Sequence, residues 1–339
     1  MFPQRLVASL LDWFSTHART LPWRENATPY HVWLSEILLQ QTRIAAVLDA
    51  YRRFLKQYPT IEDLAKGDDA TLMKLWEGLG YYSRARNLKK CAQIVSARGG
   101  FPQTAEELQK LPGIGPYTAG AIAAIAFNQP SVAVDGNVTR VVSRLQGRTL
   151  SRKETAEFLQ PWIPAGQAGV FVQSWMELGE IICLPHGVPH CDQCPLRLNC
   201  KALQTNRIDE LPAKPSHTKR PVIPLTVFHL ISQDGRLALR KRPATGLLAS
   251  LWEFPNCPGT LTVEQARKWL EEQGLIVNSI TSEPATKHLF THREWQMTNF
   301  HATVYPELPE FIWATSDEIA TQYALPTAFR NPQKSREDV

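Results

Sequence analysis

Two acidic residues have surroundings that suit catalysis by a carboxyl group. Glu36 lies in the apolar run of residues 30–41, next to Ile37 and Leu38. Partial burial raises the pKa of a carboxyl group, which favours a role as general acid. Asp135 stands directly before a predicted helix. Position alone favours a solvated or salt-bridged glutamate and a helix N-cap aspartate, so the catalytic roles are a hypothesis at this point.

Four of the six cysteines fall within eighteen residues, separated by seven, two and five positions: Cys183, Cys191, Cys194 and Cys200. Thiolates at this spacing can converge on an iron–sulfur cluster or on zinc. Four unligated buried thiols are the less favoured interpretation. In the same loop His186 and His190 are interpreted as ordinary loop residues, and Cys91 and Cys257 as core or surface residues without a role. In a cytosolic chain such a group of cysteines indicates a metal centre rather than disulfides.

A short connection between two predicted helices has the pattern of a contact to the DNA backbone. Gly113 and Gly115 allow a sharp turn and a close approach to another surface. Amide groups at the start of the following helix can hold a phosphate without reading sequence. This is a helix-hairpin-helix pattern, and an ordinary tight turn between helices is the alternative.

A second motif pairs aromatic and basic residues. Tyr81 and Tyr82 precede Arg84 and Arg86. Aromatic rings can wedge between bases while arginines hold phosphates. Core tyrosines beside a solvated basic face explain the same composition equally well.

The first 201 residues show helical periodicity. Apolar residues recur at three-to-four spacing in residues 30–41, 42–58, 70–77, 83–98, 104–110 and 116–127. Thr104 and Glu107 predict a capping box at a helix start. Residues 205–224 are rich in proline, lysine and polar residues, which predicts a linker.

Beyond the predicted linker the pattern changes to strands. Alternation predicts strands over residues 225–231, 236–240, 275–280 and 295–305, and a helix over 262–273. The sequence therefore predicts a multidomain protein. An all-α domain of residues 1–204 is followed by the linker 205–224 and by an α+β module of residues 225–339.

Composition excludes some classes of protein. The chain has 339 residues, 43% of them hydrophobic, which allows two or three packed domains and argues against wholesale disorder. Residues 1–205 hold 22 Lys and Arg against 17 Asp and Glu, a net charge of +5, whereas residues 206–339 hold 15 of each. The first part can face a polyanion, although such an excess also occurs in proteins that never bind DNA.

The same survey predicts where the protein works. The longest apolar stretch, residues 119–127, is far shorter than a bilayer span, so no membrane association is expected. Residues 1–11 lack the pattern of a secretory signal. We therefore expect a cytoplasmic monomer, associated with the nucleoid if the source is bacterial.

Together these motifs resemble the MutY family of the endonuclease III superfamily. The matching stretches are residues 21–24, 32–42, 75–82, 111–122 and 134–138 and the four clustered cysteines. They span residues 21–200 nearly without interruption. The resemblance implies a helix-hairpin-helix glycosylase core in which the loop 183–200 holds one 4Fe-4S cluster through those cysteines. The family's first cysteine interval is usually six residues, and here it is seven, which puts DNA contacts of that loop in doubt.

The resemblance also implies a reaction and its residues. Glu36 matches the general acid that protonates a departing adenine, and Asp135 the carboxylate that stabilises the resulting sugar cation. Such chemistry parallels glycoside hydrolysis and requires the base to be flipped out of the duplex. Further matches are Tyr117 and Asn137 beside the aspartate, Trp23, Arg24 and Glu177 near the flipped adenine, and Gln41 and Tyr81 in the gap that it leaves.

The expected function is removal of adenine mispaired with 8-oxoguanine or guanine in double-stranded DNA, as a step of base excision repair. Bifunctional relatives have a lysine at the position of Tyr117, which attacks the sugar. Its absence predicts a monofunctional enzyme. A bifunctional endonuclease III-like glycosylase/lyase is the alternative, and a DNA-binding protein without enzymatic activity is a further one.

The C-terminal module resembles the MutT-like domain that recognises the lesion in this family. Residues 239–255 carry the likeness, and Phe290, Thr291 and His292 match the recognition element, with Thr291 in place of a serine. A bare strand edge is the alternative for this element. Residues 267–275 form an incomplete Nudix box that lacks acidic residues needed for Mg²⁺, so we predict recognition rather than nucleotide hydrolysis.

Overall fold

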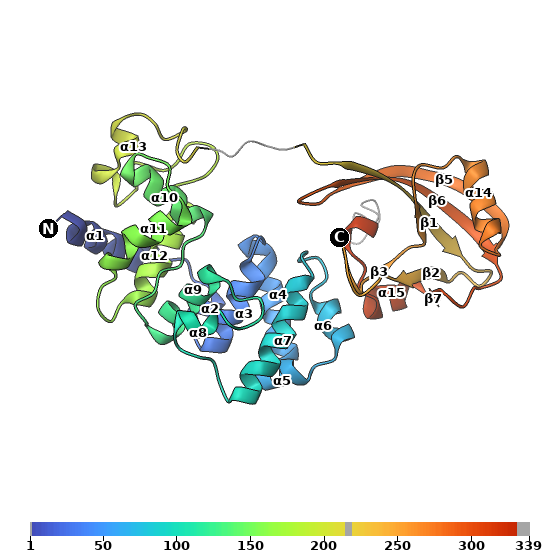
Figure 1. The fold of residues 1–339 in the computed structure, drawn as a ribbon, viewed down its shortest axis with the longest axis horizontal. Coiled ribbons are helices and arrows are strands. Elements are labelled where there is room, and N and C mark those ends of the chain that lie inside the picture. The colour runs from blue at the N-terminus through green and yellow to red at the C-terminus, as the bar shows by residue number, and fades with distance from the viewer. Residues whose placement is uncertain (1, 214–218, 331–339) are drawn as a thin grey trace. The chain divides into compact units, whose positions relative to one another are not determined.

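The computed structural model describes residues 2–213 and 219–330, and the chain forms two compact units (Figure 1). The first unit comprises Met1–Lys66 and Arg86–Ser216, and the second comprises Gly67–Ala85 and His217–Val339. A short internal segment of the N-terminal half thus belongs to the unit that contains the C-terminal half. Residues 214–218 of the predicted linker lie outside the described residues. Among the described residues no helix combines the length and the apolar character needed to cross a membrane.

The first unit is built from helices, and no strand occurs in residues 2–213 of the described chain. Its elements are α1 (Phe2–His17), α2 (Pro22–Glu25), α3 (Pro29–Leu39), α4 (Ile44–Gln57), α5 (Ile61–Lys66), α7 (Ser83–Arg98), α8 (Ala105–Leu108), α9 (Pro116–Phe127), α10 (Gly136–Gln146), α11 (Arg152–Leu159), η1 (Gln160–Trp162), α12 (Ala168–Ile181), η2 (Arg197–Asn199) and α13 (Lys201–Gln204). The first three residues of α7 belong to the second unit.

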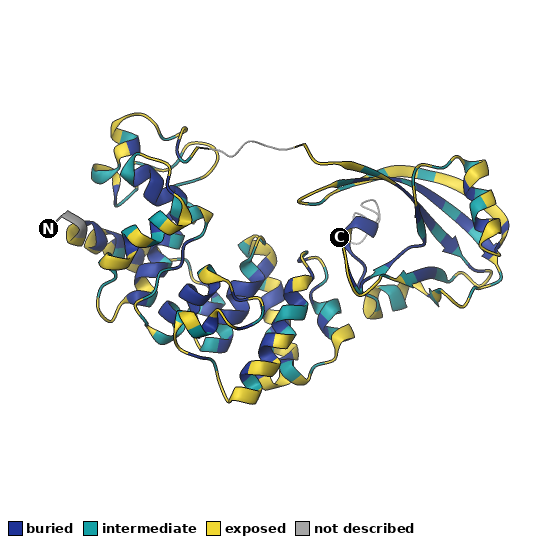
Figure 2. Ribbon diagram, viewed as in Figure 1, coloured by how far each residue is buried: buried dark blue, intermediate teal, exposed yellow. Residues whose placement is uncertain are grey.

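Helix α9 is the central element of the first unit. Residues 118–124 are all buried, because the helix consists of small and apolar residues on every side (Figure 2). It packs against both α3 and α12. Gly120 allows the chain before α10 to lie directly on α9, since a Cβ at this position would be 1.9 Å from the carbonyl oxygen of Val132. This contact fixes the segment that leads to Asp135.

One apolar core joins several helices of this unit. Its members come from α1, α9, α10 and α12 and include Leu10, Ala121, Val138, Val142, Phe171 and Trp175. Close packing of such side chains limits the movement of the helices relative to one another. The residues that project from α9, α10 and α12 therefore hold fixed positions.

The second unit contains one helix from the N-terminal half and a mixed sheet. Its elements are α6 (Asp69–Leu75), β1 (Val222–Ile231), β2 (Leu237–Lys241), β3 (Trp252–Glu253), β4 (Asn256–Pro258), α14 (Val263–Glu272), β5 (Ile276–Leu289), β6 (Glu294–Tyr305), β7 (Ile312–Ala314), α15 (Ser316–Gln322) and η3 (Thr327–Phe329). The strand order is β3-β2-β1-β6-β5, with β4 paired to β1 and β7 paired to β2. Strands β1 and β6 are parallel, and the other pairs are antiparallel.

Apolar side chains cover both faces of this sheet. Along β1, Phe228 and Leu230 enter the core that includes α14, whereas Leu225 and Val227 enter the core closed by η3. The alternation follows from the two-residue repeat of a strand. The ring of Trp269 in α14 stacks on Phe228 with 4.8 Å between centroids.

Three local predictions were wrong in detail. Strand β5 continues to Leu289, well past the predicted end at residue 280. Most of its residues after position 280 are polar, so the alternation of apolar and polar residues that predicts a strand stops there. Helix α6 ends at Leu75 rather than at residue 77, since Gly78 has a φ of +88°. At Thr104 only half of the predicted capping box forms, because the Glu107 carboxylate instead accepts from Arg98 at 3.2 Å.

Candidate active site

The first unit contains a cavity of about 590 Å³ that brings together residues far apart in sequence. It is lined by side chains from α2, α3, α9, α10, α12 and the neighbouring turns. The predicted site residues among them are Trp23, Arg24, Glu36, Gln41, Tyr117, Asp135, Asn137 and Glu177. Both predicted catalytic carboxylates therefore face one cavity.

Glu36 is buried in this cavity on helix α3. The residue is 6% exposed, and its Oε2 atom has no hydrogen-bond partner in the described structure. Burial raises the pKa of Glu36 to about 7. The hydroxyl of Tyr117 and the charge of Arg24 oppose this shift, whereas the charge of Asp135 adds to it. Because Glu36 is buried and its Oε2 atom is unpaired, it is not the solvated or salt-bridged glutamate that its position alone favoured.

Asp135 is the N-cap of α10 and also lines the cavity. Its Oδ1 atom accepts a hydrogen bond from the Val138 amide at 2.8 Å. This bond fixes the carboxylate at the helix N-terminus, where the helix dipole favours a negative charge. The N-cap role and a role in the cavity are therefore compatible.

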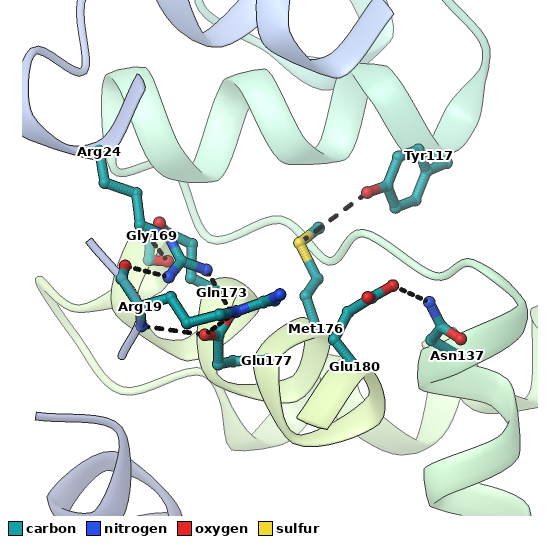
Figure 3. Close-up of polar contacts among 9 residues, drawn as sticks. All are labelled: Arg19, Arg24, Tyr117, Asn137, Gly169, Gln173, Met176, Glu177 and Glu180. Atoms are coloured by element: carbon teal, nitrogen blue, oxygen red, sulfur yellow. Dashed lines mark hydrogen bonds and ion pairs between the residues drawn. The ribbon is translucent and has the colours of Figure 1, made fainter. Parts of the chain in front are cut away.

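Asn137 is held from both sides of its amide group. Its Nδ2 donates to Oε1 of Glu180 at 2.9 Å (Figure 3), and its Oδ1 accepts from Arg140 at 2.9 Å. The Arg140 side chain also donates to the carbonyl oxygens of Gly179 and Cys183. These contacts leave the Asn137 amide a single orientation.

Tyr117 projects from the first turn of α9 toward α12. Its hydroxyl lies 3.8 Å from the sulfur of Met176, to which it donates (Figure 3). Burial raises the pKa of Tyr117 well above its usual value, and the charges of Glu36 and Asp135 add to the effect. The phenol therefore stays protonated beside the two carboxylates.

Glu177 forms a buried ion-pair network with two arginines (Figure 3). Arg19 donates to both carboxylate oxygens at 2.7 and 3.0 Å, and Arg24 donates to Oε2 at 2.7 Å. Burial opposes ionisation of Glu177, but these hydrogen bonds outweigh it and lower the pKa to about 2. Glu177 therefore stays ionised in the wall of the cavity, and the two arginines balance its negative charge.

Several further residues of the cavity were not predicted as site residues, among them Arg19, Gln173, Met176 and Glu180. The last three lie with Glu177 on one face of α12, at the spacing i, i+3, i+4 and i+7. Extending that helical face from Glu177 identifies them. Arg19 gave no such signal, because its partner is 158 positions away.

The predicted hairpin joins α8 to α9, which pack against each other. Gly113 has a φ of +77°, and a Cβ there would be 2.8 Å from Cβ of Asn87. Gly115 is the N-cap of α9, and a Cβ there would contact no protein atom within 4 Å. The start of α9 is thus uncapped by any side chain, as a phosphate site at a helix N-terminus requires.

The two residues predicted to occupy the gap in the duplex share an uncommon backbone conformation. Gln41 has a φ of 58° and Tyr81 a φ of 46°. Non-glycine residues with positive φ are rare and concentrate at functional turns. Gln41 lines the cavity of the first unit, whereas Tyr81 belongs to the second unit and is 46% exposed.

The predicted recognition element is the turn of the hairpin between β5 and β6. The Phe290 amide donates to the Arg293 carbonyl oxygen at 2.9 Å, and the Phe290 ring contacts Trp295 at 4.8 Å. Thr291 and His292 at the tip are exposed. The Thr291 hydroxyl is 2.6 Å from the hydroxyl of Tyr81. The element is therefore a hairpin tip rather than a bare strand edge.

The four clustered cysteines are all free and partly buried, while Cys91 and Cys257 are fully buried. Burial raises the pKa of Cys194 to about 12, the Leu196 amide lowers it, and the other three clustered cysteines raise it further. The first cysteine interval, residues 184–190, includes an exposed segment at 185–188, where Gly187 has a φ of +72°. Across the described residues, no three His, Cys, Asp or Glu side chains meet as a single metal ion would require.

Each half of the chain matches a known protein family. The family "HhH-GPD superfamily base excision DNA repair protein" matches residues 34–165, and the family "NUDIX domain" matches residues 226–332. A structure titled as a non-covalent endonuclease III–DNA complex aligns with a TM-score of 0.53 and 25% identity, covering 61% of this chain and 98% of that one. The fold and the cavity thus define a helix-hairpin-helix base excision repair protein with a Nudix-type module.

Two curated relatives narrow the class. The adenine DNA glycosylase of Arabidopsis thaliana is 38% identical over 299 residues, which cover 75% of this chain and 47% of that protein. The adenine DNA glycosylase of Buchnera aphidicola subsp. Baizongia pistaciae is 33% identical over 293 residues, which cover 84% and 82%. The chain belongs to the adenine DNA glycosylase family. It spans about half the length of the Arabidopsis relative.

Proposed function

We propose that this protein hydrolyses the N-glycosidic bond of adenine mispaired with 8-oxoguanine or guanine in duplex DNA, without cleaving the strand. The observation that carries the proposal is the meeting of Glu36 and Asp135 in one cavity of about 590 Å³, a volume that accommodates a purine nucleotide. Membership of the family supports the choice of adenine. Bases in a duplex must be extruded to enter such a cavity.

Glu36 supplies the proton. A pKa of about 7 leaves a large fraction of its carboxyl groups protonated at neutral pH, so the group can donate to a ring nitrogen of adenine. Adenine then leaves as a neutral base rather than as an anion. The Oε2 atom of Glu36 is buried without a hydrogen-bond partner in the described structure.

Asp135 offsets the positive charge that develops on the sugar as the bond breaks. Its position is fixed by the Val138 amide, so little reorganisation accompanies the reaction. Tyr117, protonated and without an amine, cannot attack the sugar as a lysine does. Water therefore completes the reaction, and the product is an abasic site in an intact strand.

We further propose that the Thr291 hairpin reads the base opposite adenine. Its exposed hydroxyl can exchange hydrogen bonds with 8-oxoguanine, and its loop is held by the packing of Phe290 on Trp295. The box at 267–275 lacks the acidic residues needed for Mg²⁺, because Lys268 and Gly259 stand at two of their positions. Recognition rather than nucleotide hydrolysis is therefore proposed for the module.

Cys183, Cys191, Cys194 and Cys200 fit one 4Fe-4S cluster, which we propose as the cofactor. Four thiolates are the usual ligand set of such a cluster. A zinc site would instead bring sulfurs within about 3.8 Å of one another, given a tetrahedral Zn–S length of about 2.3 Å. Iron analysis and the visible spectrum of anaerobically purified protein distinguish the two, and zinc without iron would contradict the proposal.

The function is tested with purified protein and duplexes that contain A:8-oxoguanine, A:G or A:T. We expect alkali-dependent breaks at adenine in the first two duplexes and none in the third. Glu36→Gln and Asp135→Asn should each lower the rate by at least about a hundredfold, the lower end of the range for a general acid. Unchanged rates in both variants would contradict the assignment.

The same assay distinguishes the alternatives. Strand breaks without alkali, on a duplex with oxidised thymine, would favour a bifunctional glycosylase/lyase. Mg²⁺-dependent turnover of 8-oxo-dGTP would show a nucleotide hydrolase. Binding to mispaired duplex with no base release in any assay would favour a DNA-binding protein without enzymatic activity.

A further inference from the structure

Within the second unit, helix α6 and the turn after it are attached to the C-terminal residues by two charged side chains. Lys74 and Glu77 form an ion pair of 2.8 Å and are only 21% and 13% exposed. Neither residue lines the catalytic cavity. Both residues also form hydrogen bonds, Lys74 to α15 and Glu77 to the segment after it.

Lys74 caps the C-terminal end of α15. Its Nζ donates to the carbonyl oxygens of Ile319 and Tyr323, both at 3.2 Å. Carbonyl groups at the end of a helix lack partners within the helix, and the helix dipole favours a positive charge there. With Glu77 as the third acceptor, all three ammonium hydrogens have a partner.

Glu77 binds the segment that follows α15. Its Oε1 atom accepts from the Leu325 amide at 2.9 Å and from Arg330 at 2.6 Å. Leu325 belongs to the apolar core that also contains Trp295, against which Phe290 packs. The attachment is therefore continuous with the hairpin that carries Thr291.

The same short turn ends at Tyr81, four residues beyond Glu77. The turn is closed on itself by a hydrogen bond from the Trp76 indole to the Gly80 carbonyl oxygen at 2.9 Å. At its end the Tyr81 hydroxyl meets the Thr291 hydroxyl at 2.6 Å. One rigid turn thus contacts the module at its base through Glu77 and at its tip through Tyr81.

We propose that Lys74 and Glu77 are positioning residues that hold the Tyr81 turn against the Thr291 hairpin, and that they thereby set how strongly the protein prefers 8-oxoguanine over guanine opposite adenine. The inference rests on the proposed function. The two residues act through Tyr81 and Thr291 and touch neither the adenine cavity nor its carboxylates.

The test measures single-turnover rates on A:8-oxoguanine and A:G duplexes for the full-length protein. Glu77→Gln and Lys74→Met should lower the ratio of the two rates by about tenfold, a typical coupling between sites. The rate on A:G should change by less than about twofold. Lys268→Met and Glu272→Gln are matched controls, because this pair is 78% and 59% exposed on α14, and neither should alter the ratio.

Two measurements keep the test decisive if a variant folds poorly. Arg330→Gln changes a residue that is 46% exposed, and in combination with Glu77→Gln it should show a non-additive loss in the ratio. Hydrogen exchange of the peptide 319–330 should accelerate in Glu77→Ala, because the Leu325 amide loses its acceptor oxygen. This second readout requires no enzymatic activity.

An unchanged ratio in both single variants would overturn the inference, and so would equal losses on the two duplexes, which indicate only a structural role. Unchanged hydrogen exchange would overturn the contact itself. If the wild-type protein releases no adenine but the exchange responds as expected, the proposed function fails while the attachment stands.

Discussion

Two glutamates of one cavity are driven to opposite ionisation states by their neighbours. Glu36, buried among apolar residues, has a pKa raised to about 7, whereas Glu177, bridged by two arginines, has a pKa lowered to about 2. Such divergence assigns an acid and a permanent anion within one site. At neutral pH only Glu36 can both hold and release a proton. The proposed division of labour follows from burial and pairing alone.

The first prediction concerns pH and rate. In the proposed mechanism Glu36 is the general acid, so the single-turnover rate of adenine release should be constant below its pKa and fall tenfold per pH unit above about 7. The measurement is a rate profile from about pH 5 to 9 at constant ionic strength. A rate that rises through neutrality would indicate a general base instead.

The second prediction concerns stability. The pKa of Glu36 is raised on folding, so the folded protein binds more protons than the unfolded chain between about pH 4.5 and 7, and stability is lost as pH rises through this range. Glu36→Gln removes the titrating group. Above pH 7 it should stabilise the protein by up to about 3 kcal/mol, and near pH 4 by much less. Denaturant unfolding at both pH values tests this, and equal effects would contradict it.

The third prediction concerns Glu180, whose carboxylate orients Asn137. Glu180→Ala removes the acceptor and should slow adenine release by about tenfold, the cost of about 1.4 kcal/mol. Glu180→Gln keeps an acceptor oxygen and should lose less. Single-turnover rates at saturating enzyme separate this effect from DNA affinity. Equal losses in the two variants would assign the effect to charge rather than to orientation.

At this scale the sequence predicted residues whose surroundings are local. The apolar neighbours of Glu36 in its own helix indicated partial burial, and the N-cap role of Asp135 follows from the helix after it. Their catalytic roles were predicted only from the resemblance to a family. The pairing of Arg19 with Glu177 and of Tyr81 with Thr291 depends on tertiary contacts between distant positions, which no local pattern records.

Among the elements, α9 determines where Asp135, the proposed catalytic aspartate, lies. Gly120→Ala would place a methyl group 1.9 Å from the Val132 carbonyl oxygen, a backbone atom that cannot yield without moving the segment before Asp135. We expect a loss of about 1–3 kcal/mol in stability, as in overpacked cores, together with a loss of activity. Thermal unfolding and the glycosylase assay measure the two effects.

Gly136→Ala is the matched control for stability. A Cβ at Gly136 meets no atom within 4 Å, and the residue begins α10, where alanine is a good helix former. Its melting temperature should equal or exceed that of the wild type. If both variants melted alike, the close contact of α9 with Val132 would not limit stability.

Element types could be read from the sequence more reliably than element ends. The α7 and α9 ranges were predicted without error, because apolar spacing and clear breaks coincide there. Strand β5 was cut short because Pro284 and several polar residues interrupt its pattern, although pairing with β6 continues on both sides of the irregularity. Pairing with a neighbouring strand is not visible in the pattern of one strand.

For the whole molecule, charge predicts how binding responds to salt. The excess of basic residues lies within residues 1–205, the part that contains the hairpin and the cavity. Each phosphate contact should cost about 3.5-fold in affinity when salt rises from about 50 to 200 mM. Fluorescence anisotropy over this range gives the number of contacts. An affinity independent of salt would contradict a backbone-binding hairpin.

The discontinuous second unit changes what a deletion experiment can reveal. Its residues Gly67–Ala85 are separated in sequence from the rest of the unit, which begins at His217. No single cut of the chain therefore yields the complete second unit. A fragment that ends near residue 216 would keep α6 and expose the surface that the C-terminal residues cover. Loss of lesion preference in such a fragment would have two causes that the experiment cannot separate. The Thr291 hairpin would be missing, and the turn that ends at Tyr81 would have lost its contacts. Point substitutions in the Thr291 hairpin, in the uncut chain, separate them.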